Sequence, residues 1–128
     1  MIRIRELKQE EVEFDLQVEL ECDIPVEGNA MCSDDEEADK KYEQELLDRL
    51  ERGDTTAWCM LIVTAKWKGY EGRDVLGGVT LKEANTTDED VENAWEMANW
   101  HGMKKNALDS LNGQLASWAN TLSELEVR

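Results

Sequence analysis

The sequence predicts a single α+β domain over residues 1–128, an antiparallel sheet of about three strands with helices packed on it in the order β-α-β-β-α-α. Three observations carry this prediction. Residues 14–23 alternate apolar and polar side chains, residues 56–82 hold two apolar runs around a glycine-containing turn, and residues 87–125 repeat apolar side chains every three or four positions. These patterns are typical of a half-buried strand, a hairpin and amphipathic helices.

The first expected strand, residues 14–23, has an apolar and an acidic face. The apolar positions are Phe14, Leu16, Val18, Leu20 and Cys22. The other face carries four carboxylates: Asp15, Glu19, Glu21 and Asp23. Neighbouring side chains on one strand face lie about 6.5–7 Å apart, which is similar to the spacing of phosphates along a nucleic-acid strand. An acidic outer face is also typical of a sheet whose carboxylates serve solubility alone.

A helix is predicted from about Ser33 to Arg52. Ser33 is expected as its N-cap with Glu36 completing a capping box, and Gly53 ends it. One apolar stripe is expected to face the sheet: Ala38, Tyr42, Leu46, Leu47 and Leu50. The acids are therefore expected to face solvent: Asp34, Asp35, Glu36, Glu37, Asp39 and Glu43. Such a run is also typical of a solvated helix face with acids near the positive end of the dipole.

The hairpin is predicted from residues 56–82. Residues 56–68 are the most hydrophobic stretch and have apolar side chains on both faces, which indicates a central strand. Residues 69–73 are expected to form the turn and residues 74–82 the returning strand. Gly77 and Gly78 interrupt that strand and indicate a β-bulge or a close backbone approach.

Two helices are expected to end the chain. The first begins with Thr87 as N-cap and acids in its first turn, and Gly102 is expected to kink or break it. The second, residues 104–125, spaces apolar side chains by three and four, a pattern typical of a helix that covers its own sheet. The same spacing would also suit the seam of a homodimer. That seam would run through Leu108, Leu111, Leu115, Trp118 and Leu122.

Charge is the main compositional signal. The formal net charge is −16, and residues 1–52 hold 18 acids and 7 bases, or −11 of it. A charge of this size attracts cationic partners and repels nucleic acid and acidic membranes, so direct binding to either is not expected. No apolar run is long enough to span a membrane, and the expected location is the cytoplasm. The three cysteines lack C-x-x-C spacing, which argues against a disulfide framework and a zinc site.

No catalytic, metal-ligating or cofactor-binding motif stands out, so the protein is expected not to be an enzyme and to need no cofactor or metal. The acids at 34–39 lack the D-x-D-x-D-G register of a calcium loop. A small enzyme built on His101 and either Cys32 or Cys59 is one hypothesis for function. It would need perturbed ionisable groups gathered in a cleft.

The segment AWCMLIVTAKWKGYEGRDVLGG, residues 57–78, resembles the central hairpin of a family of small, uncharacterised acidic proteins encoded by bacteriophages, prophages and other mobile elements. The resemblance implies a location in the bacterial host cytoplasm. It also implies a setting in which small acidic proteins inhibit host defence, such as restriction or CRISPR systems, by imitating nucleic acid or by blocking a basic cleft. It assigns no functional residue.

Charge and resemblance together predict a non-catalytic binding factor. Its carboxylates on the strand and the first helix are expected to engage the basic surface of a host nucleic-acid-binding protein. The alternative is a homodimeric structural or assembly protein of a phage, whose acidity serves solubility and which has no inhibitory role.

Overall fold

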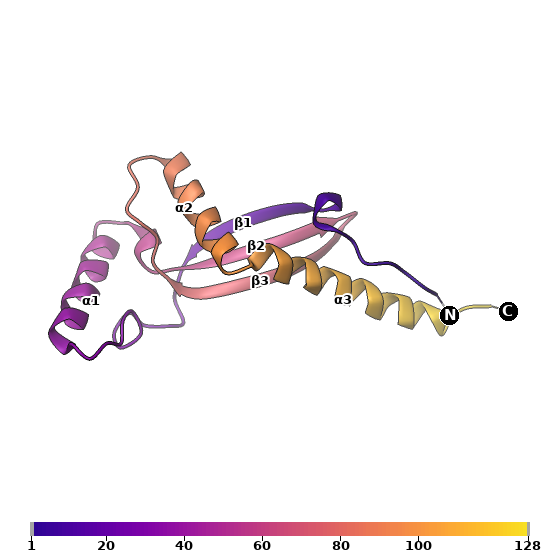
Figure 1. Cartoon of the computed structure of the whole chain (residues 1–128), viewed down its shortest axis with the longest axis horizontal. Coiled ribbons are helices and arrows are strands. Elements are labelled where there is room, and N and C mark those ends of the chain that lie inside the picture. The colour runs from indigo at the N-terminus through magenta and orange to yellow at the C-terminus, as the bar shows by residue number, and fades with distance from the viewer. Residues whose placement is uncertain (1, 128) are drawn as a thin grey trace.

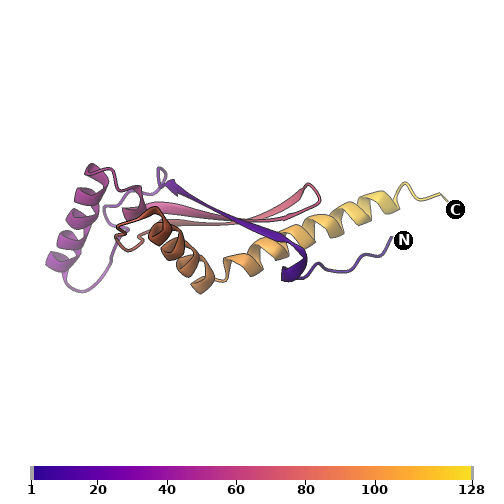
Figure 2. The ribbon, with the colours of Figure 1, turned by 90° about the horizontal axis from the view of Figure 1, so that it is seen from above.

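The computed structural model describes residues 2–127 and confirms the α+β architecture in the order β-α-β-β-α-α (Figure 1). The strands are β1 (Glu13–Leu20), β2 (Cys59–Trp67) and β3 (Tyr70–Val79). The helices are α1 (Glu36–Glu51), α2 (Thr87–Trp100) and α3 (Met103–Ser123), with short 3-10 helices at Gln9–Glu11 and Thr55–Ala57. The molecule is elongated, with α1 at one end and the two ends of the described chain at the other (Figures 1 and 2).

The three strands form one antiparallel sheet in the order β1-β2-β3, with β2 in the centre as predicted. A two-residue turn joins β2 to β3 at Lys68 and Gly69, whose φ angles are 47° and 84°. Positive φ at both positions gives the turn the twist that the flanking strands require. β3 therefore begins at Tyr70, and the prediction that residues 69–73 form the turn is wrong.

Helices α2 and α3 cover one face of the sheet, and within residues 2–127 no helix lies across the other face (Figure 2). The main hydrophobic core fills the covered side and includes Leu61, Val63, Ala65, Ala107 and Leu111. On the open face Ile62 and Thr64 are also buried, because β1 and β3 flank both residues. None of the described helices is long and apolar enough to cross a lipid bilayer.

The packing of α3 on β3 is closest at Gly72. This glycine is buried, and a Cβ atom added to it would collide with backbone atoms of Ala107 and Leu111, lying 2.7 Å from Leu111 Cα. Only a residue without Cβ lets a helix and a strand backbone approach this closely. Asn106 Nδ2 also donates to Asp74 Oδ2 at 3.1 Å, which fixes the helix along the strand.

Helix α3 is longer than the face that it covers. Its first half buries Leu108 and Leu111 in the main core, so these two residues cannot contribute to the dimer seam predicted from the sequence. Leu115 packs against the edge of the same core, whereas Trp118 and Leu122 are exposed. The second half of α3 projects beyond the sheet (Figures 1 and 2).

Helix α1 packs at one end of the sheet rather than on its face. It contacts the 3-10 helix at residues 55–57, and Leu46 joins Val26 and Trp58 in a second, smaller core. The predicted apolar stripe is therefore present from Tyr42 to Leu50 and faces this turn, not the sheet, whereas Ala38 is exposed and the prediction is wrong for it. The helix stays there because Arg49 is hydrogen-bonded to the same turn, as described below.

β1 is an edge strand, and only its first half faces the core. Phe14 and Leu16 pack against the main core, and the cluster takes no residue of β1 beyond Leu16. Val18, Leu20 and Cys22 are exposed, so the prediction of a buried face over residues 14–23 is wrong for the second half of that segment.

We expect Gly72→Ala to lower the free energy of unfolding by about 3 kcal/mol, because the added methyl group forces α3 away from β3. Gly113→Ala is the matched control. A Cβ there meets open space inside α3, and the substitution should raise the free energy of unfolding by about 0.5–1 kcal/mol. Urea denaturation measures both, and equal effects would contradict the close approach.

Candidate functional site

The start of α1 is built by two of the predicted acids. Asp35 Oδ1 accepts hydrogen bonds from the backbone N–H groups of Glu37 and Ala38, both at 3.1 Å, and is therefore the N-cap. Ser33, predicted to be the cap, instead donates from Oγ to Asp39 Oδ1 at 2.6 Å and from its backbone N–H to Asp39 Oδ2 at 2.9 Å. These bonds hold the pKa of Asp39 below its usual range. Both carboxylates thus serve the local structure of the helix.

Two further predicted acids have partners inside the chain. Glu43 Oε1 accepts from the backbone N–H of Gly28 at 2.8 Å, which ties α1 to the preceding loop. Asp15 forms an ion pair of 3.6 Å with Lys66 on the neighbouring strand. Neither carboxylate is free to act without losing a contact of its own fold.

Glu21 is only 9% exposed, so the prediction that it lines an acidic solvent face is wrong. The cause is the predicted bulge at Gly77 and Gly78, which the shifted register of β2 and β3 confirms. A bulge leaves a backbone group unpaired in the ladder, and Glu21 Oε1 accepts from the N–H of Gly78 at 3.1 Å. Because Glu21 turns inward and Asp15 is paired, the evenly spaced row of four strand carboxylates does not form.

The other five predicted acids are exposed, and their carboxylates make no hydrogen bond or ion pair with any residue in the described part of the chain. They are Glu19, Asp23, Asp34, Glu36 and Glu37. Three of them crowd the approach to α1 and its first turn. These five carboxylates are therefore available to an outside partner.

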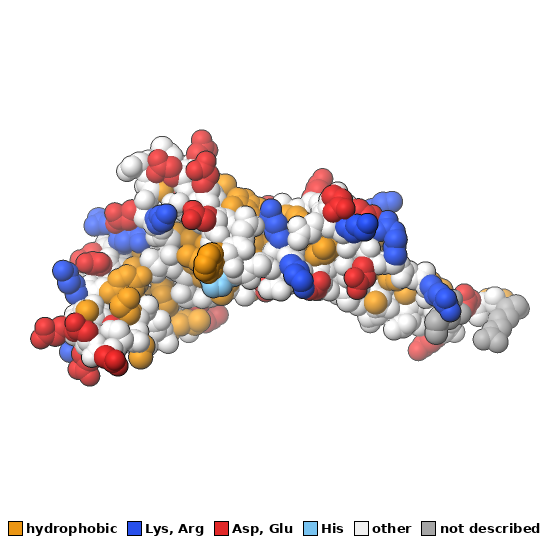
Figure 3. All heavy atoms as spheres, viewed as in Figure 1, with side chains coloured by type: hydrophobic (Ala, Val, Ile, Leu, Met, Phe, Trp, Pro, Cys, Tyr) orange, Lys and Arg blue, Asp and Glu red, His pale blue; other side chains and the backbone are white. Residues whose placement is uncertain are grey.

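Charge is segregated along the long axis of the molecule. Residues 19–58, which surround α1, contain 14 acids and 4 bases, and residues 80–101, which surround α2, contain 6 acids and 1 base. The two segments lie together at one end of the molecule, which we call the acidic end (Figures 1 and 3). With 20 acids against 5 bases it carries −15, and the remainder of the chain carries −1.

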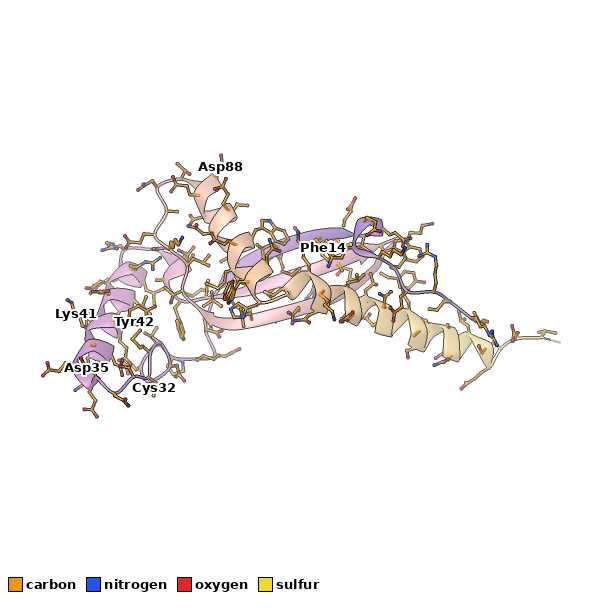
Figure 4. All side chains as sticks on the ribbon, in the orientation of Figure 1. Phe14, Cys32, Asp35, Lys41, Tyr42 and Asp88 are labelled. Carbon is orange, nitrogen blue, oxygen red and sulfur yellow. The ribbon has the colours of Figure 1, made fainter. Side chains whose placement is uncertain are left out.

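Helix α2 supplies the part of the acidic end that the sequence interpretation missed. Its acids are Asp88, Glu89, Asp90, Glu92 and Glu96. Asp88 lies at the far tip of α2 and Asp35 at the start of α1, on two separate projections of the same end (Figure 4). The dense first turn of α2 is visible in the sequence, but there the helix dipole alone accounts for its acids. The N-cap of α2 is Thr86, which accepts from the N–H of Glu89 at 3.1 Å, and not the predicted Thr87.

The buried side chain of Arg49 holds the acidic end together. Its Nε donates to Asp54 Oδ2 at 2.8 Å, and its Nη2 donates to the carbonyl of Leu81 at 2.8 Å and to Thr56 Oγ1 at 3.3 Å. Burial would raise the pKa of Asp54, but hydrogen bonds from Thr56 and Arg49 outweigh it and hold that pKa below its usual range. One side chain thus joins α1 to the turn before β2 and to the segment after β3.

The acidic end also carries an exposed aromatic side chain. Trp100, in the last turn of α2, is 85% exposed. It lines a shallow pocket of about 330 Å³ together with Leu81, Met97 and Glu96. Figure 3 shows hydrophobic side chains beside the histidine on this face. An exposed tryptophan near carboxylates is well suited to anchor a basic partner, because its ring attracts cations and buries a large apolar area.

The groups considered for catalysis differ in burial. Cys59 is buried, and burial raises the pKa of its thiol to about 12, so it is a poor nucleophile at neutral pH. Cys32 and His101 are both exposed. Within residues 2–127 no three His, Cys, Asp or Glu side chains are arranged to hold a metal ion.

Neither protein-family models nor characterised proteins nor solved structures give a match to this chain. The likeness of residues 57–78 to phage-encoded proteins stays a prediction. Function is therefore inferred from the charge and geometry of the acidic end.

We expect Arg49→Met to lower the free energy of unfolding by about 2–3 kcal/mol, because it leaves the carbonyl of Leu81 and the carboxylate of Asp54 without their partner. Arg52→Met is the matched control. Arg52 is exposed and pairs with Glu83 at 2.9 Å, so its loss should cost about 0.5 kcal/mol or less. Hydrogen exchange of α1 should increase in the first variant and stay unchanged in the second.

The lowered pKa of Asp54 also predicts a dependence on acid. The ionised Asp54 carboxylate stabilises the folded state fully at pH values above the ordinary aspartate pKa of 3.8. This stabilisation is lost as the pH falls through the lower pKa that Asp54 has in the folded state. Acid titration of the free energy of unfolding should therefore show a loss below about pH 4 that is smaller in Arg49→Met. If the free energy of unfolding of the unsubstituted protein and of Arg49→Met depended on pH in the same way, the contact with Arg49 would not lower the pKa of Asp54.

Proposed function

We propose that the protein is a non-catalytic binding factor whose acidic end occupies the basic, nucleic-acid-binding surface of a partner protein and thereby inhibits it. The observation that carries the proposal is the segregation of charge, with −15 of the total of −16 at one end. A partner of this kind carries Lys and Arg arranged for phosphates, which is the surface that a dense group of carboxylates attracts.

The segregation of acidic residues at one end is better explained by a role in binding than by a role in solubility. Charges that serve solubility work best when they are dispersed, because crowding them costs stability through self-repulsion. That repulsion is present at the start of α1, where Asp34, Glu36 and Glu37 are exposed and form no ion pair with a described residue, although Lys40 and Lys41 follow one turn later. A cationic partner would relieve the repulsion on binding, which adds to its affinity.

Trp100 would contribute binding free energy that exposed carboxylates do not provide. Exposed charge pairs steer the encounter but contribute little free energy each, whereas a large aromatic side chain at the centre of an interface commonly contributes much of the affinity. We place Trp100 and the pocket beside it within the contact, where Glu96 of α2 lines the same pocket. An arginine of the partner would satisfy both features.

The first test combines capture and charge reversal. The immobilised protein is exposed to bacterial lysate at low salt, and nucleic-acid-binding proteins that are released by salt and by added duplex DNA are identified by mass spectrometry. We expect Glu19, Asp34, Glu36 and Glu37, changed together to Lys, to weaken binding to the purified partner by at least about 100-fold. Glu21 is left unchanged because it is buried.

The matched control changes four acids of the other end to Lys: Glu6, Glu10, Glu13 and Glu124. Both variants shift the net charge equally, so an effect of net charge alone would weaken them equally. The proposal predicts that the control keeps most of its affinity. Capture that no salt releases, or equal losses in the two variants, would overturn it.

A second test concerns the aromatic anchor. Trp100→Ala should weaken partner binding by about 30-fold while leaving the salt dependence of the affinity unchanged, because no charge is removed. Trp118→Ala, an exposed tryptophan at the opposite end, should have no effect on this affinity. Isothermal titration at two salt concentrations measures both, and an unchanged affinity for Trp100→Ala would remove the tryptophan from the interface.

A further inference from the structure

The end of the molecule opposite the acidic end carries an apolar groove. Residues 2–7, the strand ends at Trp67 and Tyr70 and the second half of α3 line a volume of about 420 Å³. Trp118 and Leu122 on α3 line it and remain 53% and 45% exposed, and Ile4 and Tyr70 face it from the other walls. Partly exposed aromatic and aliphatic side chains gathered in one groove mark an interaction surface.

The walls of this groove are tied to one another. The side chain of Asn112 accepts from the backbone N–H of Leu7 at 2.8 Å and donates to its carbonyl at 3.1 Å. Farther along, Ser123 Oγ accepts from the backbone N–H of Ile2 at 2.9 Å. Two contacts between segments more than 100 positions apart hold residues 2–7 alongside α3, so the groove is formed before any partner arrives.

The helical repeat continues past the core. Leu108 and Leu111 are buried where α3 packs on its own sheet. Apolar side chains nevertheless continue at spacings of three and four through Leu115, Trp118 and Leu122. This second half of α3 projects beyond the sheet, and Trp118 and Leu122 on it are exposed. An apolar helix face of this kind is stabilised when another helix packs against it.

The charge distribution indicates what packs there. The groove belongs to the part of the chain that carries only −1, so a strongly basic partner is drawn to the acidic end instead. Two copies can meet at this end without bringing their −15 ends together, whereas any contact between acidic ends is repulsive. A two-fold axis that places both grooves face to face keeps the acidic ends farthest apart.

We infer that the groove is the interface of a homodimer, in which the Trp118–Leu122 face of α3 in each copy packs against the same face and groove of the other. The contact is isologous, so each Trp118 meets the equivalent surface of its partner. Acidic ends then project from opposite ends of the dimer. This inference is independent of the function proposed above, because it uses none of the carboxylates that would bind the inhibited protein.

Sedimentation equilibrium of the whole chain from about 1 to about 100 µM tests it. We expect a dimer mass at the upper concentrations, and a dimer Kd that stays the same or decreases as NaCl rises from about 50 mM to about 500 mM, because salt screens the residual repulsion. Binding to a basic partner responds to salt in the opposite direction, so the two proposals can fail separately. A monomer mass at every concentration and salt level would overturn the dimer.

The variant Trp118→Asp/Leu122→Asp should raise the dimer Kd by at least about 30-fold. Val91→Asp/Trp100→Asp is the matched control, since it places the same two charges at exposed apolar side chains of α2 at the other end, and it should leave the dimer Kd unchanged. Circular dichroism confirms that both variants fold. A dimer that survives the double substitution, or that is lost equally in the control, would show that the groove is not the interface.

Discussion

The close approach of α3 to β3 at Gly72 is the contact on which the rest of the structure depends. The backbones of α3 and β3 contact each other at this point, and this contact determines which part of α3 enters the core. Leu111 is therefore buried, whereas Trp118 lies beyond the sheet. Gly102, whose φ of 65° is the left-handed conformation, turns the chain between α2 and α3. With α3 fixed on the sheet, this turn directs α2 back toward the end where α1 lies (Figure 1).

The acidic end is built at a cost that a few contacts offset. Its like charges repel, and α1 is held by a small core around Leu46 and by the hydrogen bonds of Arg49. Several acids reduce the repulsion by serving as caps and acceptors, as Asp35 and Asp39 do. The carboxylates left over are those on which the proposed function depends. The stability of this end and its capacity to bind are therefore set by different side chains of the same segment.

The two ends differ in the range and the salt response of the forces they exert. Carboxylates attract a basic surface over about 8–10 Å at physiological salt, whereas an apolar groove acts only on contact and is insensitive to salt. A dimer joined through the groove would present two acidic ends on one particle. Binding at one end would raise the effective concentration of the other near a second basic site, which favours partners that are themselves dimeric or bound along nucleic acid.

The sequence by itself determined the element order, the central strand, the bulge at Gly77 and Gly78 and the identity of the acids, because these follow from local periodicity and from backbone chemistry. It could not determine that Glu21 is buried, since the N–H that draws it inward belongs to a residue 57 positions away. It likewise could not show that α2 joins α1 in one acidic end, or that Leu108 and Leu111 are lost to the core while Trp118 is not. Tertiary packing decided these features, because partnership and exposure depend on which distant segments meet.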